Sequence, residues 1–310
     1  MAVARGYVLI VVLSIIWGLA FVAIRRADLE LSSVNLTLLR WFIVSAAFLA
    51  IYPFVVKPKV RFERSDFPRL AVVALTNVVV YHLALNTAEQ TVSASLAGLL
   101  ISFGPIFLVL LSGLVLHESV GRRVWIALGV AVAGAAVISS PGLSLGTSGI
   151  LGPMLVALAG LSNAVYTVAS KPLLLKYGPI PVSAWTSLLG TAMLVPLVSP
   201  SLVAQAESLS SVGWESVLYL ALLSTVLTNT IYFTLVHGGT VSRLGVQLFL
   251  VPLVSAVGGV LILGEGLASA TVVGGALLLI AVGLVTIRRH LSEIILWRKI
   301  RSPKSYGRRR

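Results

Sequence analysis

Long apolar runs separated by short polar segments make up most of the chain. A membrane-spanning helix needs about 20 mostly apolar residues, and about ten runs meet that length. The runs are continuous and lack the alternation of polar and apolar positions that is typical of membrane β-barrel strands. The pattern therefore predicts an all-α membrane protein with transmembrane helices near residues 6–24, 33–55, 67–87, 92–115, 123–140, 148–170, 181–199, 214–236, 242–264 and 268–287.

Composition narrows the class of protein further. Apolar residues make up 58% of the 310 positions and charged residues only 11%, with a mean hydropathy of +1.03, which excludes an ordinary soluble domain. There is no cysteine, so thiol catalysis, thiolate metal sites and disulfides are excluded. The histidines have no metal-ligand spacing: His82, His117, His237 and His290. We expect no metal and no cofactor.

The net charge of +13 comes from 23 Lys and Arg against 10 Asp and Glu. With the amino terminus in the cytoplasm, nearly all the basic residues fall on the cytoplasmic side, only Arg25 and Arg26 fall outside, and Arg40 lies within a span. This asymmetry follows the positive-inside rule and predicts a multi-pass cell-membrane protein with both termini cytoplasmic. The basic tail, residues 288–310, is expected to contact anionic lipid rather than nucleic acid.

The two halves of the chain repeat one another. Thr-Val-Ser opens an apolar run at residues 91–93 and again at 240–242, and in both copies a proline is followed 13 residues later by a glutamate: Pro105 with Glu118, and Pro252 with Glu265. Each half contains five expected spans, and an odd number inverts the second half relative to the first. The sequence thus predicts two inverted five-helix repeats, residues 6–140 and 148–287, followed by the tail.

These features, together with Trp17-Gly18-Leu19-Ala20-Phe21 in the first helix and Arg40 early in the second, resemble the EamA family of the drug/metabolite transporter superfamily. The resemblance implies a ten-helix bundle with a central cavity lined by helices one to four and six to nine. It also implies transport of amino acids, metabolites or drugs, mostly outward. The halves are chemically unequal, because Asn163 and Ser187 stand where Trp17 and Arg40 would pair.

Polar and aromatic residues inside the expected spans are candidates for contact with a solute, because unpaired polar groups are costly in hydrocarbon. Several lie three or four positions apart and so share a helix face. In the alternative interpretation the Asn side chains hold helices together and the Tyr side chains lie in an interfacial belt. The predicted substrate-binding residues are Trp17, Asn77, Tyr81, Asn163, Tyr166, Asn229 and Tyr232, with Phe21 beside Trp17.

Arg40 is a further candidate substrate-binding residue, because a cation inside a span needs a partner or a wet surface. Its partner could be Glu89, in the loop after the third span. It could instead be the carboxylate of a substrate, which an Arg can bind in bidentate fashion, or the side chain could extend to the interface.

The repeated prolines and glutamates are expected to act in structure or gating. Pro105 and Pro252 should kink the fourth and ninth helices, as gate hinges or as static bends. Glu118 and Glu265 lie at hairpin ends, where a carboxylate can cap the following helix. A role as proton carriers is the alternative for these two glutamates.

The function expected from these features is that of a carrier, and an exporter in particular, that moves small metabolites such as amino acids or drug-like solutes by alternating access. A channel or a membrane interaction protein is the alternative. An enzyme is not expected, because the Gly-x-Ser-x-Gly match at 142–146 lies in a loop between spans rather than at a strand-to-helix turn. The expected partners are a small solute and membrane lipids, and a homodimer stays open.

Overall fold

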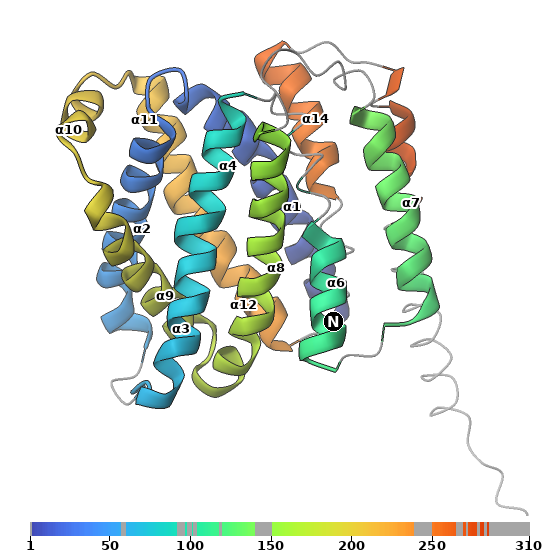
Figure 1. Cartoon of the computed structure of the whole chain (residues 1–310), viewed down its shortest axis with the longest axis horizontal. Helices are drawn as coiled ribbons and strands as arrows, with labels where there is room; N and C mark the ends of the chain where they lie inside the picture. The colour runs from blue at the N-terminus through green and yellow to red at the C-terminus, as the bar shows by residue number, and fades with distance from the viewer. Residues whose placement is uncertain are drawn as a thin grey trace, which may run out of the picture.

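The computed structural model describes residues 2–56, 60–91, 97, 101, 104–117, 120–139, 151–238, 250–264 and isolated stretches between 269 and 284. All regular elements in these ranges are helices, which run back and forth between two ends of a bundle (Figure 1). One end holds the turn between α1 (Ala2–Ala27) and α2 (Ser33–Val55), and we call it the Asp28 end. The other holds the junction of α8 (Leu151–Tyr177) and α9 (Pro179–Leu194), and we call it the Lys176 end.

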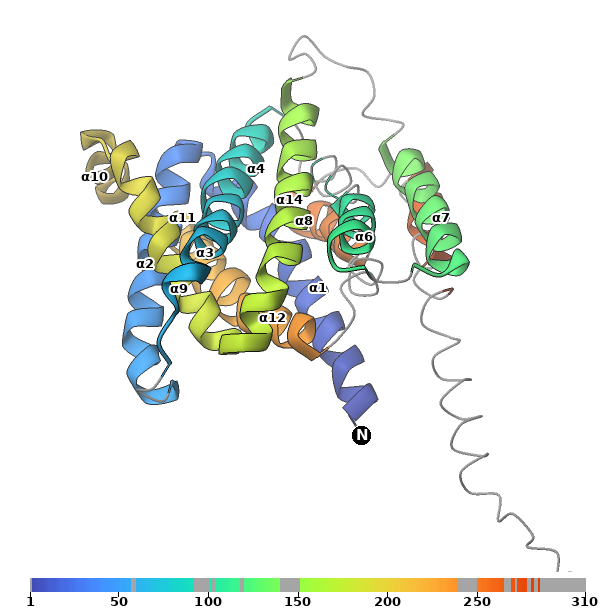
Figure 2. The same ribbon diagram turned by 60° about the horizontal axis from the view of Figure 1, so that its bottom comes forward.

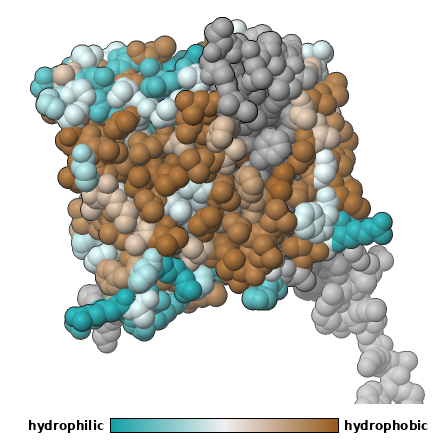
Figure 3. All heavy atoms as spheres, viewed as in Figure 1, coloured by the Kyte–Doolittle hydropathy of each residue, from teal (hydrophilic) through white to brown (hydrophobic). Residues whose placement is uncertain are grey.

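The surface between the two ends is apolar. In Figure 3 a hydrophobic band crosses the visible face, and hydrophilic residues gather above and below it. Exposed Leu, Val, Ile and Phe side chains are numerous along the helices, as expected where lipid is the solvent. The all-helical membrane architecture predicted from the sequence is therefore confirmed.

The expected count of ten spanning helices is not confirmed. Within the described ranges, six helical segments are long and apolar enough to span a membrane. The expected fourth, ninth and tenth runs are described only in part, and two apolar helices are shorter, at Ile106–Val115 and Leu250–Leu263. The six segments are Val8–Ala27, Ser33–Val55, Arg64–Glu89, Met154–Tyr177, Pro179–Leu197 and Ser211–His237.

Helix boundaries follow local chemistry. Ser32 precedes α2, and its Oγ accepts a hydrogen bond from the backbone N–H of Asn35, which caps one of the unpaired donors of the first turn. Gly178, with a φ of 83°, separates α8 from α9, and this left-handed conformation is easiest for glycine. Pro179 then opens α9, where its missing N–H is not needed.

The third and eighth spans each contain a π-helical segment. In the third span, η1 (Arg64–Asp66) and α3 (Phe67–Ala74) lead into the π segment η2 (Leu75–Val80), which continues as α4 (Tyr81–Glu89). In the eighth, α11 (Ser211–Leu218) leads into the π segment η6 (Tyr219–Leu227) and α12 (Thr228–Gly238). π turns inside helices commonly occur at functional sites. The two segments occupy equivalent places in the two halves, and the sequence pattern did not predict them.

The remaining helices of the first half and a short connecting helix of the second half complete the described structure. Helices α6 (Gly104–Val115) and α7 (Arg122–Ser139) belong to the first half, and α7 lies at one side of the bundle (Figure 2). In the second half, η5 (Val195–Leu197) is followed by the short helix α10 (Pro200–Glu207) at the Asp28 end, where no helix was expected. Asn35 Nδ2 donates to Gln205 Oε1 at 2.8 Å and thereby ties α10 to α2.

Helix contacts between the halves come in matched pairs. Helix α1 packs against α14 (Leu250–Leu263), and α6 packs against α8. In both contacts the first span of one half meets the fourth span of the other half. Likewise α4 contacts α8 while α11 and η6 contact α1, and the second spans of the halves, α2 and α9, pack together. Exchanging the halves therefore reproduces the same set of contacts, as expected for a duplicated structure.

The α1–α14 contact depends on a close approach at Gly18. A Cβ added there would lie 2.5 Å from the Cβ of Val254 and 2.9 Å from the carbonyl oxygen of Val251. Small residues allow such approach between membrane helices. Gly258 of α14 also faces α1, with Leu19 and Val22 beside it.

We predict that Gly18→Ala destabilises the protein, because the added methyl group must push α1 and α14 apart, at a typical overpacking cost of about 1–3 kcal/mol. Gly129→Ala in α7 is the matched control, since an added Cβ there meets nothing within 4 Å. Thermal unfolding of purified protein in detergent should rank Gly18→Ala well below the wild type and the control at or above it. Equal melting temperatures for the two variants would contradict this packing.

Candidate functional site

A cavity lies between the two halves of the bundle. The space open to the centre of a water-sized sphere is about 100 Å³, enough for several waters or part of a small solute. Its walls come from α1, α2, η2, α4, α6, α8, η6, α12 and α14. Every predicted substrate-binding residue except Tyr232 lines it: Trp17, Arg40, Asn77, Tyr81, Asn163, Tyr166 and Asn229.

Arg40 enters the cavity from α2 and is only 5% exposed. Its Nε donates to the Oγ1 of Thr225 in η6 at 2.9 Å. Within the described residues it forms no ion pair, so the pairing with Glu89 considered from the sequence is not formed, and its burial excludes extension to the interface. The terminal guanidinium nitrogens are therefore available to a ligand in the cavity.

The three asparagines of the cavity do not hold helices together. Asn77, Asn163 and Asn229 have no side-chain hydrogen bond to another described residue, and the Nδ2 of Asn77 is buried without a partner. Other residues link the helices instead. Ser45 and Thr191 join α2 to α9 through their hydroxyls at 2.8 Å, and Asn86 Nδ2 donates to Thr37 Oγ1 at 2.9 Å.

Aromatic rings form the cavity wall on the side of α1, α8 and α12. The Nε1 of Trp17 donates to Thr228 Oγ1 at 2.9 Å, which fixes the indole. Tyr232 stands behind it, with ring centroids 5.3 Å from Trp17 and 6.3 Å from Tyr166. The Tyr232 hydroxyl lies 3.0 Å from the Oγ1 of Thr167. Tyr232 therefore supports the wall rather than lining the cavity.

Sequence reasoning missed three polar cavity residues, His82, Ser224 and Thr225, as well as the smaller and aliphatic residues of the wall. The Nδ1 of His82 lies 2.9 Å from the carbonyl oxygen of Asn77, five residues earlier, and Thr225 Oγ1 donates to the carbonyl oxygen of Leu220, also five residues earlier. These contacts have the spacing of the π segments, which an analysis based on 3.6-residue periodicity cannot find.

The repeated prolines and glutamates are described only in part. Pro252 lines the cavity, and α6 and α14 begin at Gly104 and Leu250, so both prolines lie in the first described turn of their helix. Their role as kinks stays a prediction. Glu118, Glu265 and the tail from residue 288 lie outside the described residues.

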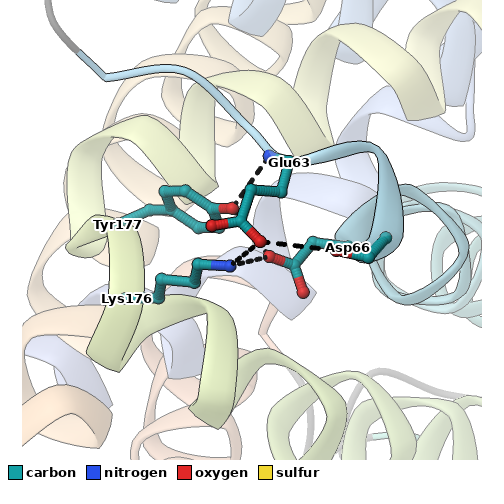
Figure 4. Close-up of polar contacts among 5 residues, drawn as sticks. Glu63, Asp66, Lys176 and Tyr177 are labelled. Carbon is teal, nitrogen blue, oxygen red and sulfur yellow. Dashed lines mark hydrogen bonds and ion pairs between the residues drawn. The ribbon is translucent and has the colours of Figure 1, made fainter.

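A polar network at the Lys176 end links the halves on the surface (Figure 4). Lys176 Nζ lies 2.6 Å from Glu63 Oε2 and 2.8 Å from Asp66 Oδ2. The hydroxyl of Tyr177 donates to the same Asp66 oxygen at 2.6 Å. The network joins the segment before α3 to the end of α8, but exposed ion pairs contribute little stability, so a conformational change can break it at low cost.

We predict that Asn163→Ala leaves stability nearly unchanged, within about 0.5 kcal/mol, because its side chain makes no contact that folding depends on. Asn86→Ala is the matched comparison: it removes the hydrogen bond to the Thr37 hydroxyl, which keeps only its own bond to the Ser33 carbonyl oxygen, and it should cost about 0.5–1.5 kcal/mol. Thermal unfolding in detergent measures both. A large loss for Asn163→Ala would mean that this asparagine does hold helices together.

Sequence comparison gives two matches to one family. The EamA-like transporter family matches residues 4–140 and again residues 150–287. The two matched ranges correspond to the two halves that share matched helix contacts.

Individual relatives are similar over most of their length. An "uncharacterized transporter" of Archaeoglobus fulgidus is 31% identical, over 88% of this chain and 95% of the relative. A "probable terminal-alkyne amino-acid exporter" of Streptantibioticus cattleyicolor is 32% identical, over 94% of this chain and 97% of the relative. A solved structure, described as "crystal structure of protein", has a TM-score of 0.74 at 18% identity, covering 93% of this chain and 99% of its own, which shows similarity of fold alone.

Proposed function

The chain belongs to the EamA-like transporter family, and we propose that it carries small amino-acid-like solutes across the cell membrane by alternating access. One observation supports this proposal above the others: a cavity between the repeats in which a buried arginine without an ion-pair partner meets unpaired amides and aromatic rings. A cavity of this kind suits a solute with a charged head group and an apolar body.

Arg40 is the proposed anchor for the solute's carboxylate. The bond from its Nε to Thr225 fixes the plane of the guanidinium and leaves two terminal nitrogens, which can form parallel hydrogen bonds to a carboxylate. Among the described residues that line the cavity, the only other basic side chain is His82, which can be neutral. A solute with one carboxylate therefore fits better than a phosphorylated solute, which would need several cations.

The remaining wall suits the rest of an amino acid. The amides of Asn77, Asn163 and Asn229 offer donors and acceptors for an amino group. Trp17 and Tyr166, supported by Tyr232, offer an apolar surface for a side chain. The cavity's size and aromatic wall favour a compact, amphipathic solute.

Alternating access would follow from the duplicated architecture. Two inverted repeats that pack through matched contacts can exchange conformations and so open the cavity first to one side and then to the other. The surface network of Lys176, Glu63 and Asp66 would open when the Lys176 end opens. The π segments place Asn77 and Thr225 at the cavity, so their movement would accompany solute binding.

Charge suggests the orientation. The Lys176 end carries Lys171, Lys176, Arg61, Arg64 and Arg69, whereas the Asp28 end carries Arg25 and Arg26. By the positive-inside rule the Lys176 end would face the cytoplasm. The named amino-acid exporter among the relatives supports outward transport.

Counterflow in proteoliposomes tests the carrier proposal. Purified protein is reconstituted with unlabelled amino acids inside, and entry of labelled amino acid is followed. Saturable entry that requires internal solute supports a carrier. Ionic current without saturable exchange would instead establish the channel alternative.

We predict that Arg40→Gln lowers exchange of amino acids at least about tenfold, because a charge-assisted bidentate contact is lost. Exchange of the matching amino-acid amides, which lack the carboxylate, should not depend on Arg40. Arg26→Gln at the Asp28 end serves as the control and should behave as the wild type. Equal loss for acids and amides would place Arg40 in the structure rather than in solute recognition.

A further inference from the structure

Glu89, the last residue of α4, is buried without a partner. It is 0% exposed, and neither of its carboxylate oxygens has a hydrogen-bond partner among the described residues. An ionised carboxylate in that position is costly, because nothing replaces the water it has lost. The proposed carrier mechanism does not use this side chain, so its retention in an apolar bundle needs another reason.

A second carboxylate lies at the same end. Asp28 occupies the turn after α1, and both its carboxylate oxygens are also buried without a described partner. Burial raises the pKa of Asp28 to about 7, against an opposing effect of Arg25. The residue as a whole is partly exposed, which places its buried carboxylate close to the water at the Asp28 end.

The charged groups that act on the Glu89 carboxylate come from three directions. Asp28 follows α1, Arg25 lies on α1, and Arg40 lies on α2. Arg25 does not form an ion pair with the Glu89 carboxylate, because its Nη1 donates instead to the backbone oxygen of Glu89 at 2.9 Å. Helix α8 also packs against α4, and residues 151–163 of α8 contain no ionisable side chain.

We propose that Glu89 is a proton-binding site, reached through Asp28, and that its ionised form competes with a solute carboxylate for Arg40. The order of groups supports this: Asp28 is partly exposed, Glu89 is enclosed, and Arg40 lines the cavity. The proton passes from water to the Asp28 carboxylate and then to a Glu89 oxygen, and no other bond changes. The competition with solute rests on the proposed function, whereas the proton site does not.

The sign of the coupling follows from charge. A deprotonated Glu89 attracts the guanidinium of Arg40 and repels the carboxylate of a solute, whereas a protonated Glu89 does neither. Solute binding should therefore take up a proton, and affinity should fall as the pH rises through the titration of Glu89. In an exporter, loss of that proton to the outside would help to release the solute.

Infrared spectroscopy tests the proton site on purified protein without any solute. A protonated, buried carboxyl gives a carboxylic-acid C=O band, which should weaken in the wild type as the pH is raised. Glu89→Gln should remove the part of this band that Asp28 does not contribute. Glu30→Gln is the matched control, because Glu30 lies in the same turn and hydrogen bonds from Ser210 lower its pKa, so the band should persist. A band unchanged by Glu89→Gln would overturn the proposal.

Amino-acid exchange in proteoliposomes tests the coupling. Wild-type exchange at limiting solute should fall about fivefold or more as the pH is raised, whereas Glu89→Gln should lose this dependence. Exchange by the wild type that does not change with pH would overturn the competition. A wild type that exchanges no solute at any pH would overturn the proposed function, and the infrared band would still decide on the proton site.

Asp28→Asn provides a second variant if Glu89→Gln fails to fold. It removes the proposed relay and one negative charge beside Glu89, so the exchange profile should shift to lower pH relative to the wild type. A profile identical to that of the wild type would exclude Asp28 from the site.

Discussion

The high cost of an unpaired polar group in an apolar bundle governs the centre of this protein. Buried hydroxyls avoid this cost by hydrogen bonding to one another, as Ser45 does with Thr191, and these bonds hold the helices together. Arg40 and the cavity asparagines meet it differently, because they border a space that water or a solute can enter. The division between paired and unpaired polar groups thus separates the scaffold from the site.

The two halves share the same helix packing but differ in the side chains that they place at the cavity. The matched contacts of α1 with α14 and of α6 with α8 enclose the cavity between two similar halves. The chemistry inside is unequal: Arg40 in α2 has Ser187 as its counterpart in α9. If Arg40 binds the solute as proposed, one arginine among the described cavity residues would give the solute one defined orientation, which a symmetrical pair of cations would not.

Sequence periodicity predicted the helices and most of the polar and aromatic residues that line the cavity, because an amide and a ring spaced three or four positions apart must share a helix face. It could not predict the π segments, which displace His82 and Thr225 relative to regular helical positions. It also predicted that Tyr232 lines the cavity, whereas Tyr232 packs behind Trp17 and Tyr166. Periodicity shows which helix face a residue occupies, but not whether another side chain lies between it and the cavity. Arg40 and Glu89 do not form the ion pair considered from the sequence. The distance between two side chains on different helices cannot be read from their positions along the chain.

Access to the cavity from each side of the membrane tests the central claim most directly. The chain has no cysteine, so Ser224→Cys introduces a single thiol into the cavity wall with little change of shape. A membrane-impermeant maleimide should label this thiol from either side of oriented vesicles. A transported amino acid should slow both labelling reactions. The control, Ser208→Cys at the Asp28 end, should react from one side only. Labelling of Ser224→Cys from one side only, at a rate that solute does not change, would contradict alternating access to this cavity.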